Sequence, residues 1–231
     1  MSSFRGKMEE YARLLVEVGV NLKPGEPLVI SAPVEGAEFV RMMAKIAYQH
    51  GCTDIYMNWM DDVLTRLKYE NAPLEVFEIF PRWKAEPLEE FAKKGGNFIY
   101  ISAEDPQLLQ GIDTKKISAN NKAAGIGLKE YRNYTMNDIN SWCVASIPTI
   151  SWAKRLFPEM EEVEAVEKLW DAILEATRMN MENPVEAWKQ HIETLEEKVS
   201  YLNEKKFAKL HYTSNNGTDL MIELPEGHIW A

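Results

Sequence analysis

The four histidines are the side chains best suited to hold a metal ion, so their spacing is the first test for metal chemistry. They are His50, His191, His211 and His228, and none stands in the H-E-x-x-H arrangement that places two zinc ligands on one helix face. His191 and Glu193 are two residues apart on a predicted helix, where their side chains point in different directions. These residues therefore do not predict a metal site.

Glu226 and His228 are a second pair with ligand chemistry. If this stretch is extended, the two side chains share a face, because strand side chains repeat every second residue. Two ligands do not complete a site, since zinc is held by three or four protein side chains. We expect no metal at this pair alone, and the simpler interpretation is a histidine at the edge of a loop.

Cys143 is the candidate nucleophile, and it lies beside Trp142 in an apolar run that predicts a buried strand. Burial raises the pKa of a thiol and makes it unreactive. No G-x-S-x-G elbow offers a serine instead. Cys52 is the other cysteine of the chain, and so few cysteines indicate two reduced, buried thiols in a cytoplasmic protein rather than a disulfide framework.

Phosphate-binding loops are also poorly supported. Gly125–Gly127 resembles half of a glycine-rich loop, but Glu130 stands where the third glycine belongs, and the segment lies inside a predicted helix. The turn Ala32–Gly36 is better placed, because open α/β sheets bind ligands at the carboxyl ends of their strands. Glu35 would repel a phosphate there. A small-molecule site at this turn is one functional hypothesis.

Composition narrows the class of protein. The 231 residues include 26 Lys and Arg against 36 Asp and Glu, which gives a net charge of −10. Such a chain repels nucleic acids and anionic membranes, and we expect neither as a partner. No apolar run approaches the ~20 residues that a membrane-spanning helix needs. The segment Met1–Glu10 is polar and charged and has no apolar region, so we expect that it is not a signal peptide.

Alternating strands and helices must position any site. The predicted strands are residues 27–31, 53–59, 97–102 and 142–147. Helical spacing of apolar residues predicts helices over residues 4–18, 35–50 and 113–131, and two more within 61–94. Strands separated by helices need crossover connections, so the sequence predicts an α/β fold with a mostly parallel sheet flanked by helices.

The pattern changes in the last third of the chain. Residues 159–204 form two long, charged helical stretches, and the two β runs after Lys206 flank Ser214–Gly217, whose Asn-Gly pair is typical of a hairpin. We expect residues 1–205 to be an N-terminal α/β domain and residues 206–231 to open a second domain that is cut at Ala231, because such a hairpin cannot bury a core of its own.

Four sets of segments stand in an order that is typical of one enzyme family. They are Tyr11–Pro24 with Glu26–Ile30; Ile101–Pro106 with Gly111–Asp113; Ile147–Thr149 with Trp152–Ala153 and Phe157–Pro158; and Asn216–Leu220 with Leu224 and His228–Trp230. Together they resemble the M29 family of thermophilic metallo-aminopeptidases (aminopeptidases T, S and PepS), and the likeness covers nearly the whole chain.

The resemblance implies an enzyme of about 410 residues, far above the usual size of one domain. It implies a homodimer that removes N-terminal residues from peptides with two divalent ions (Zn, Co or Mn). The family's ligands lie in its second domain, in a part that this sequence does not reach. We therefore assign no catalytic or metal residue here, expect no bound metal in this chain alone, and leave the substrate-binding residues open.

The alternative is a non-catalytic α/β module for binding or oligomerisation. Its basis is the charged helical stretch 159–204 and the content of eleven Met and seven Trp residues. Trp83, Trp152 and Trp188 could pack against a partner, because protein interfaces favour Trp and Met.

Overall fold

The computed structural model describes residues 3–231. The chain forms two compact units, Met1–Pro184 and Val185–Ala231. We call the described part of the first, residues 3–184, the sheet unit, and the second the hairpin unit. The domain boundary that we expect near residue 205 falls at the end of a helix of the hairpin unit, and that helix ends at Lys205. This boundary stays a prediction.

A four-stranded sheet forms the centre of the sheet unit. Its strands are β1 (Leu28–Pro33), β2 (Ile55–Met60), β3 (Asn97–Ser102) and β4 (Trp142–Ser146). Their order across the sheet is β2-β1-β3-β4, and all three neighbouring pairs are parallel. The predicted parallel α/β sheet is confirmed, with each strand end within two residues of its expected position.

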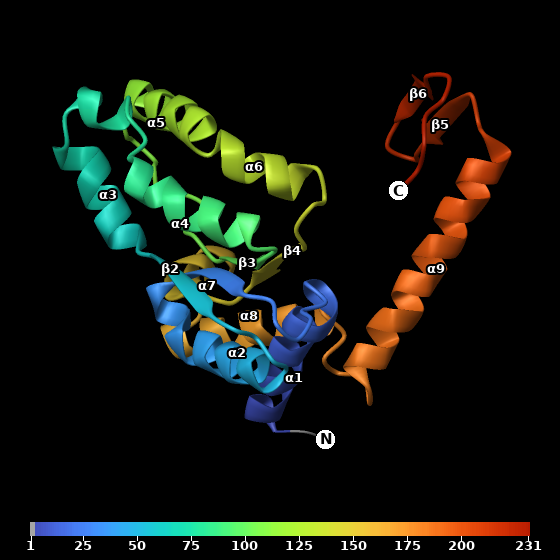
Figure 1. The fold of residues 1–231 in the computed structure, drawn as a ribbon, viewed down its shortest axis with the longest axis horizontal. Helices are drawn as coiled ribbons and strands as arrows, with labels where there is room; N and C mark the ends of the chain where they lie inside the picture. The colour runs from blue at the N-terminus through green and yellow to red at the C-terminus, as the bar shows by residue number, and fades with distance from the viewer. Residues whose placement is uncertain (1–2) are drawn as a thin grey trace. The chain divides into compact units, whose positions relative to one another are not determined.

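Helices cover both faces of this sheet. They are α1 (Phe4–Leu14) with a π-helical turn η1 (Leu15–Gly19), a short 3-10 helix η2 (Val34–Gly36), α2 (Ala37–Gln49), α3 (Asp62–Asn71), a 3-10 turn η3 (Leu74–Phe77), α4 (Arg82–Lys93), α5 (Thr114–Gly127), α6 (Lys129–Met136), α7 (Ile150–Leu156) and α8 (Glu162–Ala176). In Figure 1, α3 to α6 lie on one side of the sheet, and α1, α2, α7 and α8 lie on the other. Crossover connections between parallel strands place helices on both faces of a sheet in this way.

Local side-chain caps explain where several helices begin. Ser3 accepts a hydrogen bond from the Gly6 N–H at 3.2 Å, and Asp61 accepts one from the Leu64 N–H at 3.0 Å. The Thr149 hydroxyl accepts a hydrogen bond from the Trp152 N–H at 3.4 Å and caps the start of α7. The apolar spacing of the sequence does not predict this short helix. Each cap satisfies a backbone donor that the first turn of a helix leaves unpaired.

The core is built around β1 and the helix α1. Leu28, Val29 and Ile30 are fully buried, as expected for a central parallel strand that is covered on both faces. The Tyr11 hydroxyl donates to the Ser146 carbonyl at 3.1 Å and accepts from the Ser146 N–H at 3.2 Å, which ties α1 to the edge strand β4. Burial raises the pKa of Tyr11 to about 12.

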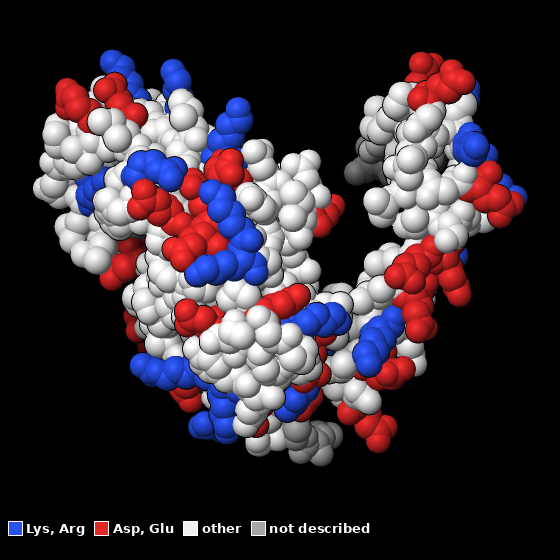
Figure 2. Space-filling view, in the orientation of Figure 1, with Lys and Arg blue, Asp and Glu red and all other residues white. Residues whose placement is uncertain are grey.

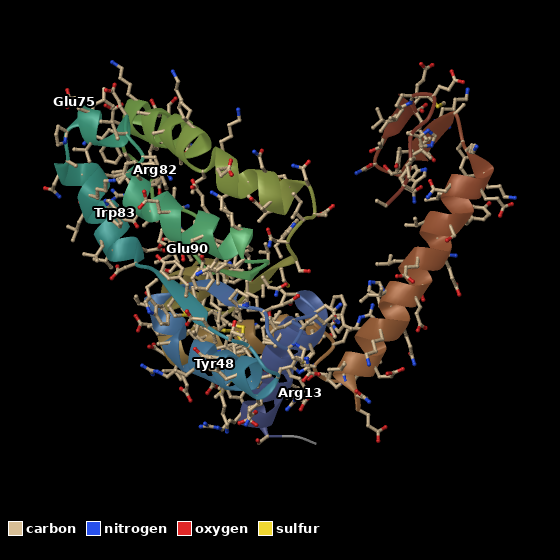
Figure 3. All side chains as sticks on the ribbon, viewed as in Figure 1. Arg13, Tyr48, Glu75, Arg82, Trp83 and Glu90 are labelled. Carbon is tan, nitrogen blue, oxygen red and sulfur yellow. The ribbon has the colours of Figure 1, made fainter. Side chains whose placement is uncertain are left out.

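Charged side chains are spread over the sheet unit rather than gathered by sign, and Figure 2 shows basic and acidic residues interspersed on the visible face. The best-built ion pair lies on α4, where Arg82 donates to both oxygens of the buried Glu89 at 2.9 and 3.0 Å. Figure 3 shows Arg82, Trp83 and Glu90 along this helix. Within residues 3–231, every helix is too short or too polar to cross a membrane.

The hairpin unit consists of most of the helix α9 (Pro184–Lys205) and an antiparallel pair of strands, β5 (Lys209–Thr213) and β6 (Asp219–Glu223). Gly217 takes a positive φ of 91° in the turn, as the Asn-Gly signal predicts. Asn203 exchanges two hydrogen bonds with the backbone of Trp230, at 2.8 and 2.9 Å, which holds the last residues against α9. All five residues of β6 are exposed.

Candidate functional site

A pocket of about 560 Å³ opens at the carboxyl edge of the parallel sheet. All four strands lead residues into it: Glu35 follows β1, Asp62 follows β2, Asp105 follows β3 and Thr149 follows β4. The strand order reverses between β1 and β3, because the chain first adds β2 on one side and then β3 and β4 on the other. The pocket therefore lies at the topological switch point, where open α/β sheets bind their ligands.

Hydrogen bonds between the loops fix the shape of this edge. The Asp62 carboxylate accepts from the Asp105 N–H at 2.9 Å, and the Asp105 carboxylate accepts from the Gln107 N–H at 2.8 Å. The buried Thr149 hydroxyl donates to the Ala103 carbonyl at 2.9 Å. Each carboxylate keeps an oxygen beyond these bonds, because a carboxylate can accept about four hydrogen bonds.

Arg66 is the one basic residue among the residues that line the pocket, and its guanidinium is already engaged. It donates through Nε to Glu70 at 2.6 Å and through Nη1 to the carbonyls of Leu108 and Gln110 at 2.8 and 2.9 Å. Its charge is balanced by Glu70. The carboxylates of Glu35, Asp62 and Asp105 therefore set the electrostatic character of the pocket, which is negative.

A further carboxylate lies close to this edge. Tyr100 donates a short hydrogen bond to Glu104, which also accepts from the Ser102 hydroxyl at 3.1 Å. Burial raises the pKa of Tyr100 well above its ordinary range, and the charges of Glu104 and Asp62 add to the effect. Tyr100 therefore stays neutral near pH 7 and acts as a hydrogen-bond donor.

Exposed apolar side chains complete the wall of the pocket. Val63 and Leu67 project from α3, Ile150 begins α7, and all three are about half exposed or more. Apolar side chains of this size, rimmed by polar groups, mark a surface that binds something. The pocket thus combines apolar contact area with negative charge.

The turn Ala32–Gly36, for which the sequence suggests a small-molecule site, contributes Glu35 to this pocket. Ala32 and Pro33 complete β1, and Val34–Gly36 form the 3-10 helix that carries Glu35. Packing accounts for Gly36, because a Cβ at this position would lie 2.4 Å from the Ile147 side chain. The glycine allows close packing between the loops that follow β1 and β4.

Other candidates from the sequence lie elsewhere. Burial raises the pKa of the Cys143 thiol, as expected. Cys143 is nonetheless only half-buried, where the sequence predicted full burial, because β4 is an edge strand. Cys52 is buried, and both thiols are free. Gly125–Gly127 lies at the end of α5, and Gly127 makes room for the ring of Phe80.

Glu226 and His228 do not share a strand face, because the chain turns at Glu226–Gly227 with a φ of 82° at Gly227. The extended conformation assumed for this pair is wrong. The His228 ring instead lies 2.9 Å from the Pro225 carbonyl and against Trp230. His191 packs edge-on against Trp188 along α9.

A metal centre is not assembled by the residues that the structure describes. Within residues 3–231, no three His, Cys, Asp or Glu side chains converge in a way that could hold a metal ion. Asp62, Glu35 and Asp105 line one pocket without forming such a group. A dinuclear centre therefore does not fit this set of residues.

The sequence analysis missed Asp62 and Asp105 as pocket residues. Their position is the signal that could have found them, since Asp62 follows β2 by two residues and Asp105 follows β3 by three. Asp62 lies within the predicted helical region 61–94, and Asp105 lies within the Ile101–Pro106 segment. The rule that the carboxyl ends of parallel strands converge at one edge would bring the two residues together.

Comparison with known proteins decides the family. The sequence matches the family described as thermophilic metalloprotease (M29) over residues 4–231. The chain belongs to the M29 family. The resemblance drawn from the Tyr11–Pro24 and later segments is thereby confirmed, and with it the identification of the chain as part of a metallopeptidase family whose named relatives are aminopeptidases.

M29 relatives match the chain from end to end. Aminopeptidase AmpS of Bacillus subtilis (strain 168) is 47% identical over 231 residues, which are 100% of this chain and 56% of the relative. Aminopeptidase 2 of Geobacillus stearothermophilus is 40% identical over 230 residues, which are 100% of this chain and 55% of the relative. The chain thus spans little more than half the length of these relatives.

A solved M29 structure has the same fold. Wild-type AmpT from Thermus thermophilus superposes with a TM-score of 0.91 at 33% identity, over 99% of this chain and 56% of that chain. The fold, with its parallel sheet, flanking helices and β-hairpin, is therefore shared with this relative.

Proposed function

We propose that this chain is the N-terminal part of a metal-dependent aminopeptidase that releases N-terminal residues from peptides. The observation that carries the proposal is the M29 match over residues 4–231, together with relatives named aminopeptidases that are 33 to 47% identical along the whole chain. At such identity, the residues of this chain occupy corresponding positions in those enzymes.

The metal ligands of the enzyme, in this proposal, belong to the part of the M29 relatives that this chain does not match. Two findings support it: the match covers 56% of AmpS, and no three potential ligands converge among residues 3–231. We propose two divalent ions, Zn, Co or Mn, held by that other part, and a chain 1–231 that is inactive by itself.

The sheet unit would act as scaffold and as one wall of the chamber in which peptides bind. A cytoplasmic homodimer is the form that we propose for the whole enzyme. Its partners would be peptides rather than nucleic acids, because the chain carries a net charge of −10 and Figure 2 shows no continuous basic surface on the visible face.

The test is aminopeptidase activity of the purified 231-residue chain toward a leucine anilide, with Co²⁺, Zn²⁺ or Mn²⁺ added in turn. AmpS of Bacillus subtilis, assayed in parallel, is the positive control, and a chelator is added to a second set of both. We expect metal-dependent release from AmpS and none from the chain. Chelator-sensitive release by the chain would overturn the ligand placement, and Glu226 and His228 would be mutated first.

A non-catalytic binding or oligomerisation role is the second candidate, and one observation favours it. The hairpin unit exposes large apolar side chains, among them Leu195, Tyr201 and Ile229. Sedimentation velocity over a wide range of concentrations tests this second role, because a strict monomer argues against it. Self-association agrees with both roles, since the proposed enzyme is itself a homodimer, and the activity assay above then separates them.

A further inference from the structure

We propose that the pocket at the carboxyl edge of the sheet binds the positively charged part of a peptide, with an apolar side chain of the same peptide lying beside it. The cation is either the α-ammonium group or the side chain of a lysine or arginine. That the ligand is a peptide rests on the proposed aminopeptidase function. The preference for a cation next to an apolar group rests on the pocket alone.

Topology is the first argument. Loops from all four strands line the pocket, and its position between the ends of β1 and β3 is the switch point of the strand order. The backbone loops at such a point diverge and leave a crevice that the fold itself does not fill. A volume of about 560 Å³ lies within the range of small-molecule sites, and it has room for one or two amino-acid residues.

Charge is the second argument, and it excludes the usual ligand of such a crevice. Phosphate groups bind here in other α/β proteins through glycine-rich loops and helix N-termini. Glu35, Asp62 and Asp105 line the pocket and would repel a phosphate. Because Glu70 and two carbonyls engage Arg66, no free cation of the lining residues compensates the three carboxylates.

The apolar wall is the third argument, and it separates an organic cation from a metal ion. Val63, Leu67 and Ile150 contribute exposed aliphatic surface to the same pocket. A hydrated metal ion gains nothing from such surface, and no metal-binding group forms among residues 3–231. A protonated amine linked to an aliphatic chain matches both parts of the wall, since burial of apolar area and charge complementarity act together.

Binding is best measured by titration calorimetry on the 231-residue chain with four short peptides, all amidated at the C-terminus. Leu-Gln-Leu carries only the α-ammonium charge, and acetyl-Leu-Lys-Leu carries only the lysine charge. Acetyl-Leu-Gln-Leu is neutral, and acetyl-Leu-Glu-Leu is acidic. Hexylamine is the non-peptide cation. None of these measurements needs hydrolysis, so failure of the binding proposal and failure of the aminopeptidase proposal are separate results.

We expect at least one cationic peptide to bind about tenfold more tightly than the neutral peptide, and the acidic peptide to bind most weakly. Which of the two cationic peptides binds identifies the source of the charge. Equal binding of cationic and neutral peptides would overturn the proposal. Hexylamine that binds as tightly as the better peptide would overturn the assignment to a peptide.

The double variant Asp62→Asn/Asp105→Asn tests the position of the site. Asparagine keeps an acceptor oxygen for the N–H groups of Asp105 and Gln107, so the loop hydrogen bonds can persist while both charges are lost. We expect the preference for the cationic peptide to fall to less than about twofold. A preference that stays intact in a folded double variant would overturn the location.

Two further variants guard this result. Glu164→Gln on α8 removes one exposed carboxylate outside the pocket and should leave the preference unchanged. Glu35→Gln removes a pocket carboxylate for which the described residues provide no hydrogen bond or ion pair, so it tests the charge even if the double variant fails to fold. We expect a loss of roughly threefold from it. No loss from Glu35→Gln, with the double variant unfolded, would also count against the proposal.

Discussion

Strands β1 and β6 are both rich in apolar residues, but their surroundings differ. In the sheet unit, Leu28, Val29 and Ile30 of β1 are almost completely buried between two layers of helices. In the hairpin unit, Leu220, Met221 and Ile222 of β6 are all more than 40% exposed. The same residue types thus contribute to a core in one unit and remain at the surface in the other.

Apolar content alone therefore does not make a core, because a sheet needs a second layer against which to bury its face. The sheet unit has helices on both faces, whereas the hairpin unit has one helix and two strands. A two-stranded hairpin is marginally stable in water. The hairpin unit should therefore depend on surface that it does not itself provide.

Amide hydrogen exchange should give the largest contrast. The amides of β1 exchange only through global unfolding, whereas those of β5 and β6 exchange through local opening of an exposed hairpin. With a global stability of at least about 5 kcal/mol, the two sets should differ by at least ~10³-fold in protection. Exchange is followed by NMR or mass spectrometry. Equal protection of β1 and β6 would mean that the hairpin unit has a core of its own.

Truncation of one isoleucine in each unit should give the next largest contrast. Ile30→Ala removes a fully buried side chain and should cost about 2 to 5 kcal/mol of unfolding free energy. Ile222→Ala, at a position 41% exposed, should change it by about 0.5 kcal/mol or less. Both values come from urea denaturation followed by circular dichroism. A cost at Ile222 that equals the cost at Ile30 would contradict the difference between the units.

Most of the fold could be predicted from the sequence, because the apolar patterns of the sheet unit match the residues that its strands and helices bury. The apolar runs of β1 and β3 and the helical spacing between them predict a covered parallel sheet. Thr149 and α7 show where this method ends. A helix of seven residues is too short for apolar periodicity to reveal, so the Thr149 cap is the signal that the sequence offers for it.

The site was less predictable for a different reason. Glu35, Asp62 and Asp105 are separated by 27 and 43 positions, and only the strand order brings them to one pocket. Sequence patterns give the direction of each strand but not its neighbours. The turn that contains Glu35 is predictable because it directly follows the first strand, whereas Asp62 lies at the start of a helix, where a charged residue is common.

The pH dependence of stability should isolate a contact that the sheet unit has and the hairpin unit lacks. Burial raises the pKa of Tyr11 from 10.0 to about 12. Since the folded-state pKa is the higher one, this contribution is fully present below pH 10 and is lost as the pH rises from about 10 to 12. The loss should amount to about 2 to 3 kcal/mol in the wild type.

Tyr11→Phe is the matched variant for that measurement. It should be less stable than the wild type at pH 8, because the Ser146 N–H and carbonyl lose their partner. The difference between variant and wild type should shrink toward pH 12, because the phenylalanine cannot ionise. Urea midpoints at several pH values provide the test. A difference that stays constant from pH 8 to pH 12 would show that Tyr11 does not titrate as its burial requires.

Two ion pairs give the smallest contrast. Arg82 holds the pKa of the buried Glu89 below its usual value through two hydrogen bonds, so this pair stabilises above about pH 4.5 and its contribution is lost as the pH falls through the lowered pKa. Glu89→Gln should lower the urea midpoint at pH 7. The midpoint of this variant should also fall less than that of the wild type as the pH is lowered.

His211 and Asp219 lie 2.6 Å apart on the exposed hairpin, where solvent weakens any ion pair. His211→Gln should therefore leave the urea midpoint unchanged. If His211→Gln lowers the urea midpoint more than Glu89→Gln does, the hairpin must be shielded from solvent. That result would contradict the exposure of its two strands.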